Sequence, residues 1–122
     1  MKTIQLIVVL LTLACTGLAA EPVSGDWSGV IKVGEMNLRL VLHITDSGKG
    51  LQATFDSVDQ KVMGMPVDKV EVKGQQLKFE IGSIGATYAG TLNKTGTALT
   101  GAWSQLGMFF PLNFQKASPK RK

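Results

Sequence analysis

Apolar and polar residues alternate with a period of two along most of this chain, and no segment shows the spacing of an amphipathic helix. The clearest case lies in residues 37–45, where one face of the predicted strand carries Leu38, Leu40, Leu42 and Ile44. Glycine-rich turns interrupt the alternation at short intervals. The sequence therefore predicts an all-β fold of about eight short strands between Trp27 and Phe114.

Such strands within residues 21–115 leave no room for crossover helices, so neighbouring strands should pair antiparallel as a meander. An open sheet of that length would leave two strand edges unpaired, and closure into a small barrel removes both. We therefore expect a single small antiparallel barrel domain over residues 21–115. The alternative is a two-sheet β-sandwich.

A short motif occurs twice, once near each end of the predicted domain. Residues 24–28 read Ser-Gly-Asp-Trp-Ser, and residues 100–104 read Thr-Gly-Ala-Trp-Ser. Glycine permits a sharp strand bend and leaves room for the indole ring two residues later. The motif predicts that Trp27 and Trp103 sit at equivalent strand starts and that an indole caps one end of the barrel.

Residues 1–20 have the pattern of a secretory signal peptide. Lys2 provides the positive start, an apolar stretch covers residues 4–13, and small residues precede the expected cleavage after Ala19 or Ala20. About ten apolar residues are too few for the roughly twenty that span a bilayer. We therefore expect an exported protein that is periplasmic or secreted.

Cys15, the only cysteine, permits a second interpretation of this segment. The three residues before it, Thr-Leu-Ala, form a degenerate version of the bacterial lipoprotein box, which normally has leucine where Thr12 stands. Lipidation at Cys15 would make the protein a membrane-anchored envelope lipoprotein, and without it we expect no membrane partner. Cleavage after Ala19 or Ala20 would instead remove the only thiol from the chain.

The net charge of +4 comes from the two ends of the chain. Lys2 and four residues of the segment 116–122 account for five of the 13 Lys and Arg residues. Residues 21–115 therefore contain the other eight basic residues and all nine acidic residues. The sequence therefore predicts a nearly neutral fold and a basic, disordered tail over 116–122. Because we expect export, we expect no nucleic-acid partner.

The sequence lacks residues with the spacing of a catalytic site. His43 is the only histidine and falls on the polar face of its predicted strand. Residues 81–85 read Ile-Gly-Ser-Ile-Gly and so lack the first glycine of the G-x-S-x-G hydrolase motif. We predict no catalytic residue, no metal site and no cofactor. The alternative is a minimal hydrolase or isomerase in which His43 acts with an aspartate or with Tyr88.

The most individual segment is residues 56–68, which is too long for a tight hairpin. We interpret its acids, Asp56 and Asp59, as solvated loop residues. Long loops at a barrel end commonly form the mouth or a contact surface. The candidates for ligand or partner binding are two methionines of this loop, a third methionine near the C-terminal end, and three large aromatic residues: Met63, Met65, Met108, Trp27, Tyr88 and Trp103.

Six motifs in the same order resemble the accessory domain that precedes the catalytic domain in many exported bacterial alpha/beta hydrolases. They read GDWSG at residues 25–29, LRLVLHI at 38–44, DS and DQ within 56–60, GMPV at 64–67, YAGTL at 88–92 and LTGAW at 99–103. The first of them also resembles the G-x-W start of lipocalins. This resemblance implies an all-β, lipocalin-like small barrel whose own role is poorly defined. The chain ends where the hydrolase domain would begin, so no catalytic residue is carried over.

These observations predict an exported, non-catalytic β-barrel module. It would bind either a protein partner, such as a separately encoded exported hydrolase, or a small apolar ligand. Large residues such as Phe55 and Phe79 favour a mostly filled lumen with a shallow mouth near Met63, Met65 and Met108. We therefore expect interaction at the surface rather than deep capture of a ligand.

Overall fold

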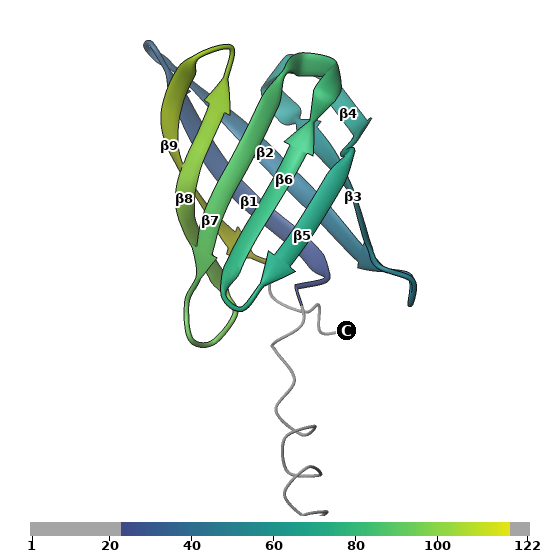
Figure 1. The fold of residues 1–122 in the computed structure, drawn as a ribbon. Coiled ribbons are helices and arrows are strands. Elements are labelled where there is room, and N and C mark those ends of the chain that lie inside the picture. The colour runs from purple at the N-terminus through teal and green to yellow at the C-terminus, as the bar shows by residue number, and fades with distance from the viewer. Residues whose placement is uncertain (1–22, 118–122) are drawn as a thin grey trace, which may run out of the picture.

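Nine antiparallel strands form one sheet in the computed structural model, which describes residues 23–117. Figure 1 shows that the sheet curls into a half-barrel. The strands are β1 (Gly25–Val33), β2 (Met36–Asp46), β3 (Leu51–Ser57), β4 (Val62–Pro66), β5 (Lys69–Lys73), β6 (Gln76–Ile81), β7 (Ala86–Leu92), β8 (Ala98–Gln105) and β9 (Met108–Lys116). Two short 3-10 helices, η1 (Val58–Gln60) and η2 (Gly82–Ile84), follow β3 and β6. The predicted all-β fold is confirmed, with one more strand than expected.

The additional strand is β4, which lies in the segment that we expected to be a long loop. Its pairing with β3 is irregular, because Met65 lies opposite Phe55 and Val62 lies opposite Ser57. Three steps along β4 therefore match two steps along β3, which is a β-bulge. Gly64, inside this bulge, has a φ of 69°. The bulge breaks the alternation that would have revealed the strand.

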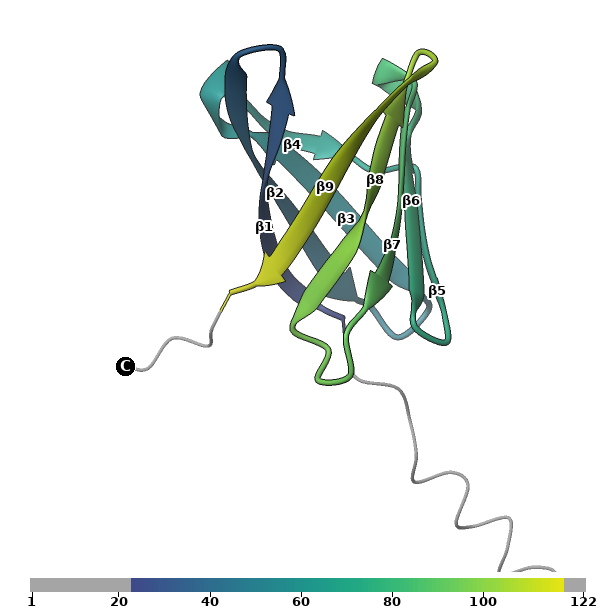
Figure 2. The same cartoon turned by 90° about the vertical axis from the view of Figure 1, so that its left-hand side faces the viewer.

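The strand order is β4-β3-β2-β1-β9-β8-β7-β6-β5, so every neighbour in the sheet is a neighbour in sequence except β1 and β9. One continuous sheet of this kind excludes the two-sheet sandwich. Trp27, Ser28 and Gly29 of β1 pair with Lys116, Gln115 and Phe114 of β9. Figure 2 shows β9 crossing to meet β1 at one end of the molecule, while the β1–β2 and β8–β9 hairpins lie apart at the other end.

The two ends of the sheet, β4 and β5, are linked by Val67 and Asp68. The Val67 N–H donates to the Ala53 carbonyl at 3.1 Å, and the Asp68 N–H donates to the Glu80 carbonyl at 2.9 Å. Within residues 23–117 no strand ladder joins β4 to β5. The meander therefore curls as expected, but a seam between these strands replaces full closure.

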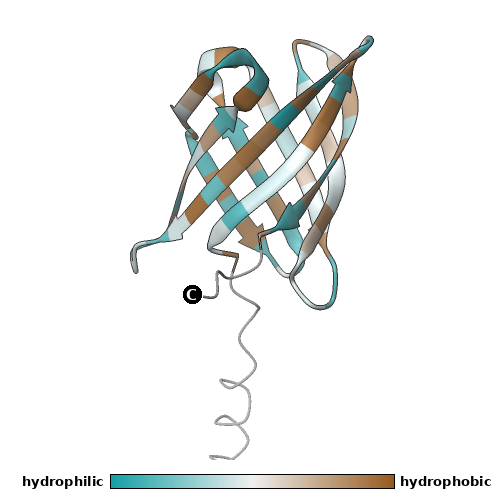
Figure 3. Cartoon of the chain, turned by 180° about the vertical axis from the view of Figure 1, so that it is seen from behind, coloured by the Kyte–Doolittle hydropathy of each residue, from teal (hydrophilic) through white to brown (hydrophobic). Residues whose placement is uncertain are grey.

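The inner face of the half-barrel is packed with aromatic side chains. Phe79 stacks on Tyr88 with ring centroids 5.3 Å apart, and Tyr88 meets Phe114 edge-on at 5.1 Å. Burial of such a ring stabilises the fold by about 1.5–3 kcal/mol, and favourable ring geometry adds roughly 0.5–1.5 kcal/mol. Figure 3 shows apolar and polar residues alternating along strands. This alternation places the apolar set inside the half-barrel.

The two Gly-x-Trp motifs lie at different places in the fold. Trp27 is fully buried at the end where β1 pairs with β9, and its indole N–H donates to the Val23 carbonyl at 2.9 Å. A Cβ on Gly101 would lie 2.1 Å from the Ala89 carbonyl oxygen, so only glycine fits between β7 and β8. The expected indole cap is therefore Trp27, whereas Trp103 faces the middle of the half-barrel.

Several predictions fall on residues outside the described range. These are the signal segment 1–20, lipidation at Cys15 and the final residues of the basic tail, 118–122. Lys116, which we assigned to the tail, is the last residue of β9 and lies with its Nζ 5.8 Å from the centroid of the Trp27 ring. Within residues 23–117 there is no helix that is long and apolar enough to span a membrane.

Candidate functional site

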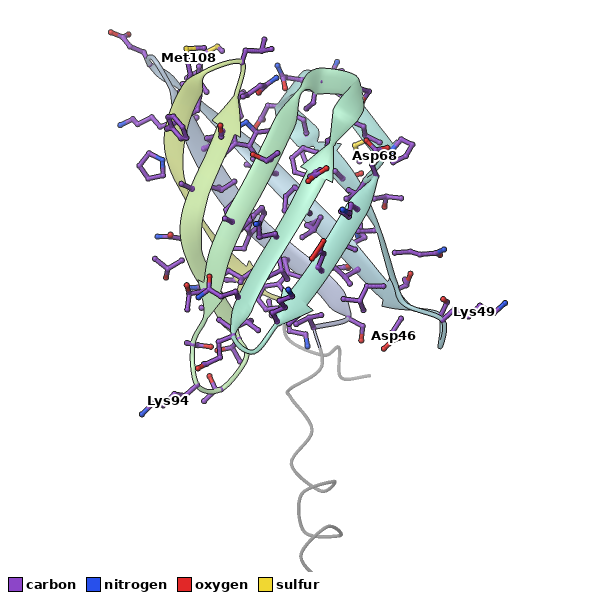
Figure 4. All side chains as sticks on the ribbon, in the orientation of Figure 1. Asp46, Lys49, Asp68, Lys94 and Met108 are labelled. Carbon is purple, nitrogen blue, oxygen red and sulfur yellow. The ribbon has the colours of Figure 1, made fainter. Side chains whose placement is uncertain are left out.

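A cavity of about 660 Å³ opens between the β1–β2 and β8–β9 hairpins. It exists because the pairing of β1 with β9 ends at Gly29 and Phe114, beyond which the two strands separate. Figure 4 places Met108 at this open end, whereas Asp46, Lys49 and Lys94 lie at the opposite end. Most of the residues that line the cavity are apolar, among them Ile31, Val33, Leu38, Leu40, Val62 and Phe110.

Trp103 and Phe55 separate the cavity from the packed core. Trp103 is almost fully buried, and its ring stacks on Phe55 with the centroids 5.2 Å apart. The indole N–H donates to Oε1 of Gln105 at 3.0 Å, and Nε2 of Gln105 donates to the Ile84 carbonyl at 3.1 Å. Because its only polar atom is already bonded, Trp103 presents an apolar surface to the cavity.

Three methionines lie at the cavity, namely Met36, Met65 and Met108, and two of them were predicted candidates. Met63 lies outside the lining, and 64% of its surface is exposed. The bulge in β4 explains the difference, because it allows both Val62 and Met65 to face the cavity and turns Met63 away. The shallow mouth that we expected is thus a cavity large enough to hold a small molecule.

Trp27 and Tyr88, the remaining predicted candidates, lie in the packed core and do not line the cavity. The Tyr88 hydroxyl donates to the Leu112 carbonyl at 2.8 Å. Burial raises the pKa of the Tyr88 phenol, so this group stays protonated and donates its hydrogen bond. Both residues have structural contacts that account for their burial.

His43 lies on the outer face between two carboxylates of neighbouring strands. Its Nδ1 is 2.7 Å from Oδ1 of Asp26 on β1, and its Nε2 is 2.7 Å from Oδ2 of Asp56 on β3. The other oxygen of Asp56 accepts the Gly64 N–H at 2.7 Å. Asp56 is therefore buried, with 11% of its side chain exposed, and is not the solvated loop residue that we expected.

In this cluster His43 and Asp56 each stabilise the charged form of the other. Hydrogen bonds from the ring to Asp56 and then to Asp26 raise the pKa of His43. Burial alone would raise the pKa of Asp56, but the Gly64 N–H and the His43 ring outweigh it and hold that pKa below its usual value. The doubly protonated imidazolium can donate to both carboxylates, whereas neutral imidazole has one N–H and can donate to only one of them.

In this geometry both ring nitrogens of His43 are engaged by carboxylates. A general base needs a free lone pair within reach of the substrate proton. Tyr88, the partner considered for His43, lies inside the half-barrel and bonds Leu112. The Asp26 and Asp56 partners follow from the strand register, in which Asp26 pairs directly with His43. The sequence contained a signal for Asp56, since alternation with buried Phe55 places Asp56 on the outer face.

Another carboxylate, that of Asp59, fixes η1 beside the cavity. Its Oδ2 accepts the Arg39 backbone N–H at 2.7 Å, and its Oδ1 accepts Nη2 of the same residue at 2.7 Å. Hydrogen bonds from Arg39 lower the pKa of Asp59. Arg39 itself is thereby engaged outside the cavity, and η1 places Gln60 at the cavity wall.

A further hollow, of about 500 Å³, lies between β3 and β5. Its wall carries polar or charged residues such as His43, Thr54, Asp68 and Lys69, and Figure 4 labels Asp68. This polar lining suits an apolar ligand less well than the open-end cavity does. Across residues 23–117, no group of three or more His, Cys, Asp or Glu side chains is arranged to hold a metal ion.

The open-end cavity is therefore the leading candidate site, because it combines volume, an apolar wall and access from solvent. No protein-family model, curated protein or solved structure matches this chain. The functional proposal is therefore argued from the geometry of the open-end cavity.

Proposed function

We propose that this protein is an exported, non-catalytic β-barrel module that binds a small apolar molecule in its open-end cavity. One observation carries the proposal: a space of about 660 Å³ lies inside the half-barrel behind a mostly apolar wall. Small-molecule sites typically have volumes of about 300–1,000 Å³ and combine apolar walls with a few polar groups. The volume favours capture of a ligand over the surface interaction expected from the sequence.

The rim of the cavity supports the same proposal. Leu106 is 78% exposed at the tip of the β8–β9 hairpin and has a φ of 48°. Such hairpin turns favour Asn-Gly, and an apolar residue with positive φ is strained. A strained and exposed leucine at the mouth of an apolar cavity is better explained by contact with a ligand than by stability.

Fluorescence titration with N-phenyl-1-naphthylamine, a neutral apolar probe, tests the proposal. The full chain should bind the probe saturably, with enhanced emission. Met65→Trp should fill part of the cavity and weaken binding at least about 10-fold, whereas Met63→Trp, outside the lining, should leave it unchanged. Absence of saturable binding, or equal losses in the two variants, would contradict the proposal.

The second candidate function is binding of a protein partner, such as an exported hydrolase. Exposed apolar side chains at the open end favour it, since Phe109 is 74% exposed beside Leu106 and Met108. Substituting Phe109 with serine separates the two functions, because Phe109 does not line the cavity. Partner binding should weaken in this variant while probe binding persists.

Export and anchoring also remain part of the proposal. The intact mass of the exported protein distinguishes the two processing routes. A chain that begins at Ala20 or Glu21 supports signal cleavage, and a chain that begins at a diacylated Cys15 supports the lipoprotein. The cavity would serve either form.

A further inference from the structure

We infer that the ligand of the open-end cavity is an uncharged molecule with one hydrogen-bond acceptor, and that the side-chain amide of Gln60 donates to that acceptor. The inference rests on the proposed function and deepens it, because it names the chemical class of the ligand. It follows from an inventory of the polar groups at the cavity wall.

The cavity is lined by no charged residue among those that the structure describes. Its polar side chains are Ser57, Gln60 and Gln105. An ionised carboxylate or ammonium that enters this space loses its hydration and meets no opposite charge, and one amide group offsets only part of that cost. A fatty-acid anion would therefore have to leave its carboxylate in solvent, whereas an ester, alcohol or ketone could enter fully.

Of these three polar side chains, Gln105 is already occupied. Its oxygen accepts the Trp103 N–H, and its nitrogen donates to the Ile84 carbonyl. A ligand that competed for Gln105 would break a contact that holds the wall of the cavity. Gln105 thus acts as part of the wall and not as the group that recognises the ligand.

Gln60 differs, because one half of its amide is held and the other half is open. The Ser57 hydroxyl donates to Oε1 of Gln60 at 2.6 Å. Ser57 is buried, so this bond orients the amide with its oxygen toward the wall. Within residues 23–117 no protein group accepts a hydrogen bond from the Gln60 NH2. Gln60 is exposed at the rim of the cavity, so its NH2 is open both to solvent and to a ligand oxygen. The bond to Ser57 preorients this donor for a ligand carbonyl or hydroxyl oxygen.

The cations nearest to this position have other places in the structure. Arg39 is held by Asp59 through its backbone N–H and its guanidinium group on the outer face. Lys61 follows Gln60 in sequence but is exposed and does not belong to the cavity wall. Neither Arg39 nor Lys61 therefore offers its charge to a ligand inside the cavity, which favours a neutral ligand.

Displacement of N-phenyl-1-naphthylamine by ligands with matched ten-carbon chains tests the inference on the full chain. Methyl decanoate should displace the probe at concentrations at least about 10-fold lower than decanoate at a pH where decanoate is ionised. Gln60→Glu keeps the acceptor for Ser57 and removes the donor, so it should weaken methyl decanoate about 5- to 10-fold. Decane should bind both proteins equally.

Two control variants keep these outcomes apart. Gln60→Leu should reproduce the loss for the ester, and an unchanged circular dichroism spectrum would show that the fold persists. Lys61→Gln should leave all three affinities unchanged. Decanoate that binds as well as the ester, or ester binding that Gln60→Glu does not weaken, would overturn the inference while leaving the proposed function intact. Failure of the probe and of decane to bind at all would overturn both.

Discussion

The two ends of the half-barrel are built from the same alternating strands but reach opposite outcomes. At the packed end, β1 and β9 pair, and Trp27, Tyr88 and Phe114 fill the space between the strands. At the open end, the same two strands separate, and Met36, Leu106 and Met108 stay more than half exposed around a cavity. We therefore expect the packed end to supply most of the stability and the open end to be free to serve binding.

The largest difference between the two ends is expected when one aromatic ring is removed from each of them. Phe79→Ala, in the packed core, should lower the free energy of unfolding by about 3–5 kcal/mol, because it leaves a cavity among neighbouring rings. Phe110→Ala, at the half-buried cavity wall, should cost roughly 1–2 kcal/mol. Urea unfolding measures both. Equal losses would show that the open end carries as much stability as the packed end.

A smaller effect is expected from a single buried hydrogen bond at the packed end. Tyr88→Phe keeps the ring and removes the hydroxyl that donates to the Leu112 carbonyl. The stranded carbonyl should lower the free energy of unfolding by about 1–2 kcal/mol. Thermal and urea unfolding should show this loss with unchanged affinity for the apolar probe. A change in affinity would mean that the two ends are coupled.

The outer cluster around His43 predicts a pH dependence of stability. The folded pKa of His43 is raised by Asp56 and Asp26, above an unfolded value of about 6.5. Its contribution is therefore fully present below about pH 6.5 and is lost as the pH rises through the folded pKa. Asp56 has a lowered folded pKa, so its contribution is present above the unfolded value of about 3.9 and is lost as the pH falls through the folded pKa.

Urea unfolding of the wild type and of His43→Gln checks this pH dependence. The wild type should exceed the variant in stability by more at about pH 5.5 than at about pH 9. An NMR titration of the ring should place its midpoint above about 6.5. A midpoint at or below that value would show that the two carboxylates do not hold the proton.

The smallest effect is expected at the tip of the open end and has the opposite sign. Leu106→Asn places a residue that tolerates positive φ in the β8–β9 turn, so stability should rise by about 0.5–1 kcal/mol. Binding of the apolar probe should weaken, because Leu106 lines the cavity. Higher stability with unchanged binding would remove Leu106 from the proposed site and weaken the contrast between the two ends.

Part of the candidate site could be predicted from the sequence, and part could not. Met65, Trp103 and Met108 were predicted and lie at the cavity. Gln60 was not singled out, because its importance comes from the hydrogen bond with Ser57 and from the empty space beside it. Similarly, a pattern of period two cannot show that Met63 is turned outward, since the bulge at Gly64 changes the phase of the alternation.

The all-β class, the meander order of most strands and the apolar inner face could be predicted from the sequence, because they follow from local alternation and turn residues. The same alternation placed His43 on the outer face. The point where β1 and β9 separate, the strand β4, and the contacts of Asp26 and Asp56 with His43 became visible only in the three-dimensional fold. Those features depend on pairing register between distant segments, and register is set by packing of the whole sheet.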